Sequence, residues 1–181
     1  EGVGKYINSP ETDLYHKSKA LFGWSYAKNA TAKVKKIILV EGQFDAILVH
    51  QSGYEYVVAL SGTASTTSHV EQLARFADEF IIATDNDYAG IQSAKKIAES
   101  AYTFEKSISI IPLPEGKDPA DVIRGNPDEW NQMVESRKDF IEFYITTQQN
   151  KEIKEKIQSV QNFLFPVIAL IQNDIYRDAQ L

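Results

Sequence analysis

The chain contains 181 residues, 43% of them hydrophobic and 11% aromatic, which is an ordinary composition for a globular protein with a sizeable core. It has no apolar run long enough to cross a membrane and no signal-peptide pattern, and the lack of cysteine excludes disulfides and thiolate metal sites. We therefore expect a cytoplasmic protein of one domain, or one domain with appendages, and no membrane partner.

The net charge of −6 is unevenly distributed along the sequence. Residues 1–36 carry seven lysines and three acids, whereas residues 37–130 carry six basic and fifteen acidic side chains. A basic arm of net +4 thus precedes an acidic core of net −9. Acids scattered over helix surfaces would form only a solvated face, but acids concentrated at strand ends favour a cation site.

Turn and helix signals occupy the basic arm. An Asn-Ser-Pro cluster at residues 8–10 predicts a turn. Apolar spacing predicts a short amphipathic helix over residues 13–24 and a second helical stretch over residues 26–32. The sequence around three lysines of the arm indicates no role for them beyond solubility. They are Lys5, Lys17 and Lys19.

From residue 37 the sequence alternates between strands and helices. Short aliphatic runs bounded by charged residues, Gly or Pro are typical of strands buried on both faces of a parallel sheet. Such runs fall at residues 37–41, 56–60 and 80–84, and residues 107–111, closed by Pro112, are the fourth expected strand. Helical spacing fills the intervals, with a Ser68-x-x-Glu71 capping box before the second of these helices. The pattern predicts an α/β, doubly wound, mainly parallel sheet of about four strands flanked by helices.

The last part of the chain is predicted to be helical. An acidic loop at residues 115–121 starts one helix, and Pro127 takes the favoured first position of the next. Residues 138–181 have helical periodicity, with a kink or break expected at Pro166. This region predicts a C-terminal helical bundle. Because the sequence lacks an initiator Met and ends inside helical periodicity, we expect it to be an excised fragment.

Carboxylates follow three of the predicted strands. They are Glu41, Asp45, Asp85, Asp87 and Asp118. Ligands of such sheets bind beyond the carboxyl ends of the strands, so we expect these side chains to lie close together. Neighbouring carboxylates raise one another's pKa unless a cation neutralises them, and an oxygen-only ligand set selects Mg²⁺ or Mn²⁺ over Zn²⁺. Each acid taken alone could instead cap a helix or bond to turn amides, above all Asp118 before Pro119.

A carboxylate-held Mg²⁺ keeps open positions that substrate phosphate oxygens usually fill, and two such ions can stabilise both oxygens of an in-line displacement at phosphorus. The lysines of the basic arm could then hold triphosphate or template phosphates. The residues therefore predict metal-dependent phosphoryl or nucleotidyl transfer, or phosphodiester cleavage, without deciding between synthesis and hydrolysis.

Four motifs occur in a fixed order after a flanking segment. The segment is Lys5-Tyr6-Ile7-Asn8-Ser9-Pro10-Glu11-Thr12 with His16-Lys17, and the motifs are Leu39-Val40-Glu41-Gly42-Gln43-Phe44-Asp45, Gly62-Thr63-Ala64, Asp85-Asn86-Asp87-Tyr88-Ala89-Gly90 and Gly116-Lys117-Asp118-Pro119. Together they resemble the Toprim domain of bacterial DnaG-type primases. Toprim also occurs in topoisomerases, recombination mediators and nucleases, but the flanking segment is primase-like. The resemblance extends over essentially the whole chain.

The resemblance implies synthesis of short RNA primers from ribonucleoside triphosphates on a single-stranded DNA template, through an RNA–DNA hybrid. It implies Mg²⁺ or Mn²⁺, with two or more ions possible, and a replicative helicase partner bound through a region outside this chain. Glu41 would lie at the catalytic metal, with a part in proton transfer, and Asp45, Asp85, Asp87 and Asp118 would bind metal. Lys5 and Lys17 would be catalytic contacts to nucleotide phosphates. Nucleotide or nucleic-acid contacts are expected from Lys5, Tyr6, Lys17, Lys19, Gly62 and Thr63.

By the same resemblance, residues 1–36 form a basic arm and helices of a preceding subdomain, residues 37–125 the Toprim metal-binding core, and residues 126–181 a truncated helical subdomain. Many relatives have an acid directly after Asp-Pro, where this chain has Ala120, with Asp121 one place later. In a helix that shift rotates the carboxylate by about 100°, which argues against Asp121 as a ligand. The family's zinc-binding module is absent here, so we expect the fragment to bind metal but to prime weakly or not at all.

Three alternatives remain open. A Toprim nuclease would degrade a single strand instead of extending from it. A phage or mobile-element primase-helicase would share the same motifs. A non-catalytic phospho-acceptor module would need a lysine at a later strand end, and Ile111-Pro112-Leu113 offers none.

Overall fold

The computed structural model describes residues 12–13, 20–61, 67–83 and 87–172. Seven site candidates named above lie outside these ranges: Lys5, Tyr6, Lys17, Lys19, Gly62, Thr63 and Asp85. The expected turn at residues 8–10, residues 14–19 of the helix expected over residues 13–24 and the last nine residues also lie outside them. In the described end of that stretch the expected helix is absent, because residues 20–23 are not helical and Phe22 forms a β-bridge with Ala59. None of the helices in the described part of the chain combines the length and apolar composition that a bilayer crossing requires.

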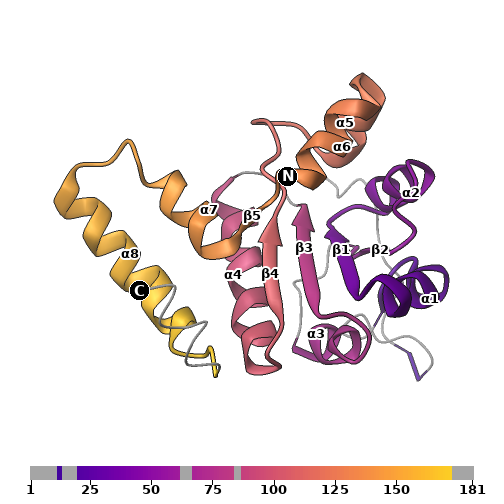
Figure 1. The fold of residues 1–181 in the computed structure, drawn as a ribbon, viewed down its shortest axis with the longest axis horizontal. Helices are drawn as coiled ribbons and strands as arrows, with labels where there is room; N and C mark the ends of the chain where they lie inside the picture. Colours follow the sequence, from indigo (N-terminus) through magenta and orange to yellow (C-terminus); the bar gives the residue numbers. More distant parts are fainter. Residues whose placement is uncertain (1–11, 14–19, 62–66, 84–86, 173–181) are drawn as a thin grey trace.

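The core is a five-stranded sheet with the strand order β2-β1-β3-β4-β5 (Figure 1). Its strands are β1 (Lys36–Val40), β2 (Val57–Ala59), β3 (Glu79–Ala83), β4 (Ser107–Ile110) and β5 (Lys138–Asp139). The first four are parallel, and β5 pairs antiparallel with β4. This confirms the predicted α/β fold with a mainly parallel sheet and adds a short fifth strand.

Strand β1 lies at the point where the strand order reverses. It pairs with β2 on one side, ending at Val40↔Ala59, and with β3 on the other, ending at Val40↔Ala83. The chain therefore goes from β1 to β2 on one side of β1. It then crosses over and forms β3 on the other side of β1. In open α/β sheets, ligands bind beyond the carboxyl ends of the strands at this switch point.

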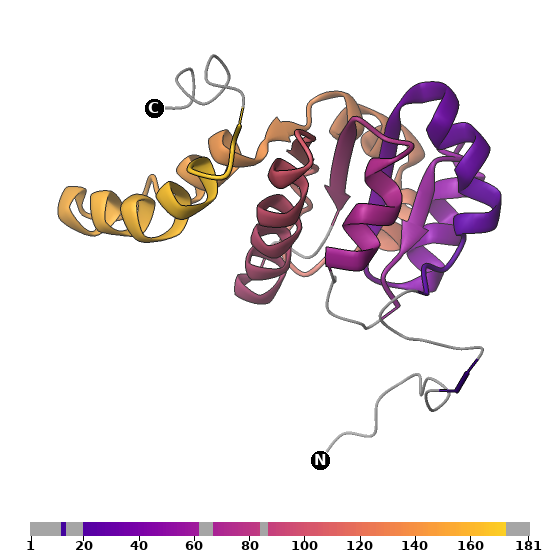
Figure 2. The same ribbon diagram turned by 90° about the horizontal axis from the view of Figure 1, so that it is seen from below.

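Helices cover both faces of the sheet because successive strand side chains alternate between two apolar clusters. Ile37 and Leu39 face one cluster and Ile38 and Val40 the other, and all four are buried. The first cluster includes residues of α1 (Trp24–Val34), α3 (Thr67–Ala74), α4 (Tyr88–Thr103), α7 (Phe140–Thr147) and α8 (Ile153–Ile168). The second includes residues of α2 (Gln43–Gln51), α5 (Pro119–Gly125) and α6 (Pro127–Glu135). The result is a sheet between two helical layers (Figures 1 and 2).

The C-terminal helices described here, α7 and α8, pack on the α4 side of the sheet (Figure 2). The rings of Tyr144 and Phe163 stack with their centroids 3.9 Å apart, and the ammonium of Lys95 on α4 lies 4.5 Å from the Phe163 ring centre. These contacts join the two C-terminal helices to each other and to α4.

Several local expectations were wrong. Helix α3 begins at Thr67, so Ser68 is its second residue and not its N-cap. Residues 138–139 form β5 instead of opening a helix. Helix α8 is not broken at Pro166 but continues to Ile168, because a proline this close to the end removes a donor only from the last turn.

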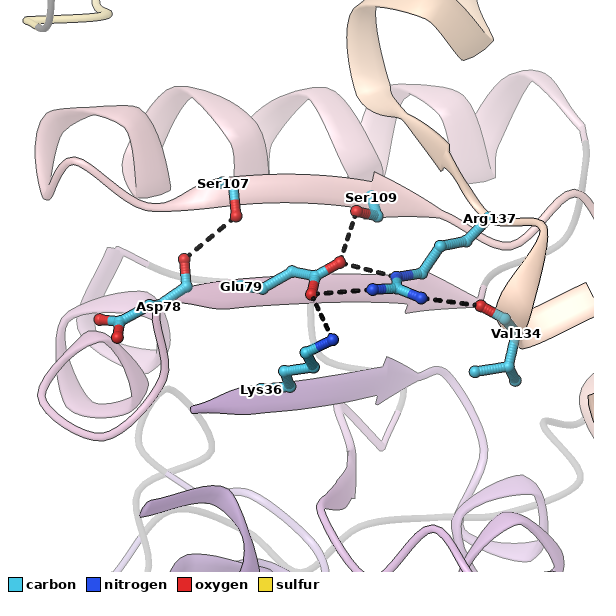
Figure 3. Close-up of polar contacts among 7 residues, drawn as sticks. All are labelled: Lys36, Asp78, Glu79, Ser107, Ser109, Val134 and Arg137. Atoms are coloured by element: carbon cyan, nitrogen blue, oxygen red, sulfur yellow. Dashed lines mark hydrogen bonds and ion pairs between the residues drawn. The ribbon is translucent and has the colours of Figure 1, made fainter. Parts of the chain in front are cut away.

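An ion-pair cluster anchors the C-terminal end of α6 to the sheet (Figure 3). Arg137 donates from Nε to Oε1 of Glu79 at 2.7 Å and from Nη2 to Oε2 at 3.0 Å. Ser109 Oγ donates to Oε1 at 2.7 Å, and Lys36 Nζ lies 3.3 Å from Oε2. Burial raises the pKa of Glu79, but the hydrogen bonds and positive charges of its partners outweigh it, so the pKa of this carboxyl lies below its ordinary value.

Replacing Glu79 with glutamine is expected to lower the free energy of unfolding by about 2 kcal/mol at neutral pH, because the Arg137 guanidinium loses its bidentate charged partner. The lowered pKa means that ionised Glu79 stabilises the fold above the pKa of an unfolded glutamate, about 4.3. This contribution is lost as the pH falls through the lower folded-state pKa. The gap between wild type and Glu79→Gln should therefore shrink from about pH 6 to about pH 3.

Urea unfolding of both proteins across that pH range measures the gap. Glu71→Gln is the matched control, because Glu71 forms an exposed pair with Arg75 on α3 and should change stability by less than about 0.5 kcal/mol. A Glu79→Gln protein as stable as wild type at neutral pH would contradict the anchoring role of the cluster.

Candidate functional site

Three strand-to-helix transitions meet at one edge of the sheet, which we call the acidic edge. They run from β1 to α2, from β3 to α4 and from β4 to α5, and the three strands are neighbours in the sheet (Figure 1). Glu41 directly follows β1, Asp87 caps α4 and Asp118 caps α5. The acids in the described part of the predicted set thus come from adjacent transitions of a parallel sheet.

Asp45 links two of these transitions. It is the third residue of α2 and only 8% exposed. Its Oδ2 accepts a hydrogen bond from the backbone N–H of Gly42 at 3.1 Å, and its Oδ1 accepts one from the N–H of Ala120 at 3.2 Å. A Cβ at position 42 would lie 2.5 Å from Oδ2, which explains the glycine. The carboxylate therefore holds the start of α2 against the first turn of α5.

Asp87 and Asp118 each cap the helix that follows them. Asp87 Oδ1 accepts from the N–H of Gly90 at 2.7 Å, and Asp118 Oδ1 accepts from the N–H of Asp121 at 2.7 Å. Their other carboxylate oxygens make no hydrogen bond within the part of the chain that the structure describes. Capping and metal binding are therefore compatible, because the cap uses one oxygen of each side chain and leaves the second for a ligand.

The neighbouring acids Glu41 and Asp121 differ in their surroundings. Glu41 is exposed just beyond the end of β1, at the switch point. Asp121 pairs with Arg124 on the same helix, with Oδ1 3.1 Å from Nη2. That Asp121 is not a ligand stays a prediction.

The fit of a divalent cation to the acidic edge depends on its donor chemistry. Among the residues with described placement, which omit Asp85, no three acidic or histidine side chains are grouped closely enough to hold a metal ion. The donors present at the edge are nevertheless carboxylate oxygens, which suit Mg²⁺ and Mn²⁺. Helices α2 and α4 also begin here, and the positive ends of their dipoles favour phosphate oxygens. The edge is therefore chemically suited to a cation together with a phosphate group.

Sequence reasoning missed the bond between Asp45 and the Ala120 backbone, because the two residues are 75 positions apart. It also missed an apolar surface hollow of about 300 Å³ beside α1 and α2. Phe22, Tyr26, Ile47 and Val57 are among the residues that line the hollow. None of its lining residues is one of the predicted site acids, so the hollow is separate from the acidic edge.

The Toprim-like family matches residues 38–123 of the chain. The DNA primase of Rickettsia felis is 40% identical over 141 residues, which cover 76% of this chain and 24% of that protein. The DNA primase of Chlamydia pneumoniae is 36% identical over 146 residues, which cover 79% of this chain and 25% of that protein. The chain thus spans about a quarter of the length of these curated relatives.

The fold is also similar to solved primase structures. The zinc-binding and RNA polymerase domains of the Aquifex aeolicus primase superpose with a TM-score of 0.82 at 29% identity, covering 99% of this chain and 44% of that one. A DnaG primase catalytic domain bound to single-stranded DNA gives a TM-score of 0.82 at 26% identity, covering 98% of this chain and 58% of that one. The similarity includes the flanking helices as well as the acidic edge. The chain belongs to the family of bacterial DnaG-type primases, in which it corresponds to the Toprim-containing part of the catalytic core.

Proposed function

We propose that this chain is part of an enzyme that synthesises short RNA primers on single-stranded DNA by metal-dependent nucleotidyl transfer. The observation that carries the proposal is the meeting of three acid-bearing transitions at the switch point of a sheet whose likeness to primase cores extends over 99% of the chain. The single-stranded DNA in one related catalytic domain supports a nucleic-acid substrate.

The metal site that we propose uses Glu41, Asp85, Asp87 and Asp118, with Mg²⁺ or Mn²⁺ as the ion. A bound ion would stabilise the negative charge that develops on phosphate oxygens during transfer. Glu41, which is exposed at the end of β1, would act from one side of the switch point, and Asp87 would act from the other. We assign Asp45 a positioning role, because both of its oxygens already accept backbone hydrogen bonds.

The remaining assignments rest on the family motifs. Lys5 and Lys17 would neutralise nucleotide phosphates, and Lys19, Tyr6 and the Gly62-Thr63 loop would contact nucleotide or template. Ribonucleoside triphosphates would be the substrates and an RNA–DNA hybrid the product. In the whole protein we place a replicative helicase contact outside this chain, and a bacterial replication enzyme works in the cytoplasm.

The proposal is tested by incubating the chain with Mn²⁺, single-stranded DNA that carries one label and ribonucleotides that carry a second label, with the two products resolved by size. Transfer yields labelled RNA in addition to an intact template, whereas a Toprim nuclease yields a shortened template. Slow ribonucleotide incorporation that Asp87→Asn abolishes is the expected result. Template shortening without incorporation, also abolished by Asp87→Asn, would show that this acidic edge serves cleavage.

A further inference from the structure

Two exposed aromatic side chains lie on the first turns of helices that begin at the acidic edge. Phe44 is the second residue of α2 and is 59% exposed, and Tyr88 is the first residue of α4 and is 79% exposed. Each follows an acid of the proposed metal site closely in sequence, Phe44 after Glu41 and Tyr88 directly after Asp87. Both aromatic residues therefore belong to the same transitions that carry the acids.

The fold puts these rings on opposite sides of the switch point. Strands β1 and β3 are neighbours and end in register at Val40↔Ala83, so their loops start about 4.8 Å apart. From there α2 runs over one face of the sheet and α4 over the other (Figure 1). Phe44 and Tyr88 consequently belong to helices on opposite faces of the sheet, and both side chains are exposed.

The folded chain gains little from burial of the Tyr88 ring. Burying an aromatic side chain is worth about 1.5–3 kcal/mol, and most of that gain is forgone at 79% exposure. Phe44 is also exposed, at 59%. Neither position needs an aromatic for helix capping, because the Asp87 carboxylate caps α4 and the Asp45 carboxylate bonds to the start of α2. Aromatic faces beside a phosphate-binding edge match the chemistry of nucleic acids, whose bases stack on such rings whatever their sequence.

We propose that Tyr88 and Phe44 are nucleobase-stacking residues, which hold the base of a nucleotide whose phosphates lie at the acidic edge. The inference rests on the proposed function, since it assumes that a nucleotide or nucleic-acid strand enters this edge. A base stacked on Tyr88 or Phe44 would fix its nucleotide on one side of the switch point. The base belongs either to the strand or to an incoming ribonucleoside triphosphate, and binding measurements separate the two.

The test compares a fluorescent single-stranded oligothymidylate with an abasic oligonucleotide of the same length, by anisotropy in the presence of Mn²⁺. If the stacked base belongs to the strand, Tyr88→Ala is expected to weaken binding of the base-containing strand by about 5- to 150-fold, the loss of one stacked base. Tyr88→Phe keeps the ring and should stay within about twofold of wild type. Phe44→Ala should behave like Tyr88→Ala. The matched control is Tyr26→Ala, because Tyr26 on α1 is also 79% exposed but lines the separate apolar hollow.

Competition assays that compare uridine triphosphate with ribose 5-triphosphate, which lacks the base, identify the source of the stacked base. A loss confined to uridine triphosphate in Tyr88→Ala assigns the ring to the incoming nucleotide, and a loss confined to the oligonucleotide assigns it to the strand. Either result supports the proposal. Equal losses on base-containing and abasic strands, or an equal loss in Tyr26→Ala, would overturn it.

The results that test the stacking role differ from the results that test the proposed function. Ribonucleotide incorporation with unchanged base-dependent binding in Tyr88→Ala and Phe44→Ala would overturn the stacking role alone. Ring-dependent binding together with strand cleavage would overturn primer synthesis and keep the stacking role. A wild-type chain that binds neither strands nor nucleotides would overturn both.

Discussion

Alanine at position 45 is expected to lower the free energy of unfolding by about 3 kcal/mol. The substitution removes a buried carboxylate that accepts hydrogen bonds from the Gly42 and Ala120 backbones. Hydrogen bonds to charged groups contribute about 1.5–3 kcal/mol each, and the donors left behind lose their partner in a poorly solvated place. Because the bond to Ala120 joins α2 to α5, we also expect the start of α5 to loosen. Urea unfolding followed by circular dichroism measures the change.

Asp87→Ala is the control for this effect. Asp87 also accepts a backbone hydrogen bond at a helix start, but it is exposed, so its loss should cost about 1 kcal/mol, the usual value for an N-cap. Asp45→Asn should fall between the two alanine variants, because the amide keeps one acceptor but presents a donor to a backbone N–H. If Asp45→Ala were no less stable than Asp87→Ala, Asp45 would not brace the acidic edge.

The second large effect is expected on metal affinity. Glu41→Gln and Asp87→Asn should each weaken Mn²⁺ binding by tenfold or more, because each removes a charged oxygen ligand, and even outer-shell partners of a ligand are worth about 10–100-fold. Both side chains are exposed, so the fold should tolerate the amides. Calorimetric titration with Mn²⁺ measures the affinity.

Glu71→Gln is the matched control for this titration, since it removes the same charge from the exposed surface of α3, away from the acidic edge. Wild-type affinity is expected for this variant. A similar weakening in Glu71→Gln would mean that the chain attracts Mn²⁺ only through its overall negative charge.

The sheet could be predicted from the sequence because its strands are buried on both faces. The runs Ile37–Val40 and Phe80–Ala83 are apolar without interruption, a pattern that a half-exposed strand or a surface helix does not produce. Strand β5 was missed because two residues, Lys138 and Asp139, carry no periodic signal, and only pairing with β4 makes them a strand. The same dependence on distant partners hid the contact between Arg137 and Glu79, which are 58 positions apart.

The candidate site could be predicted only as a set of residue types at strand ends. The sheet brings the transitions of Glu41, Asp87 and Asp118 to one edge, as expected from parallel topology. The sequence could not show that both carboxylate oxygens of Asp45 accept backbone hydrogen bonds, because one of the two donors comes from the distant α5. Metal binding by these acids remains a prediction, as does every contact assigned to the lysines of residues 5–19.

A double-mutant cycle between Glu41 and Asp87 tests most directly whether the transitions after β1 and β3 build one metal site. Mn²⁺ affinity would be measured for wild type, Glu41→Gln, Asp87→Asn and the double variant. Ligands of one shared ion are coupled, so the double variant should lose clearly less than the sum of the single losses, by about 1 kcal/mol or more. Losses that add within about 0.5 kcal/mol, or no loss in either single variant, would contradict a shared metal site at the acidic edge.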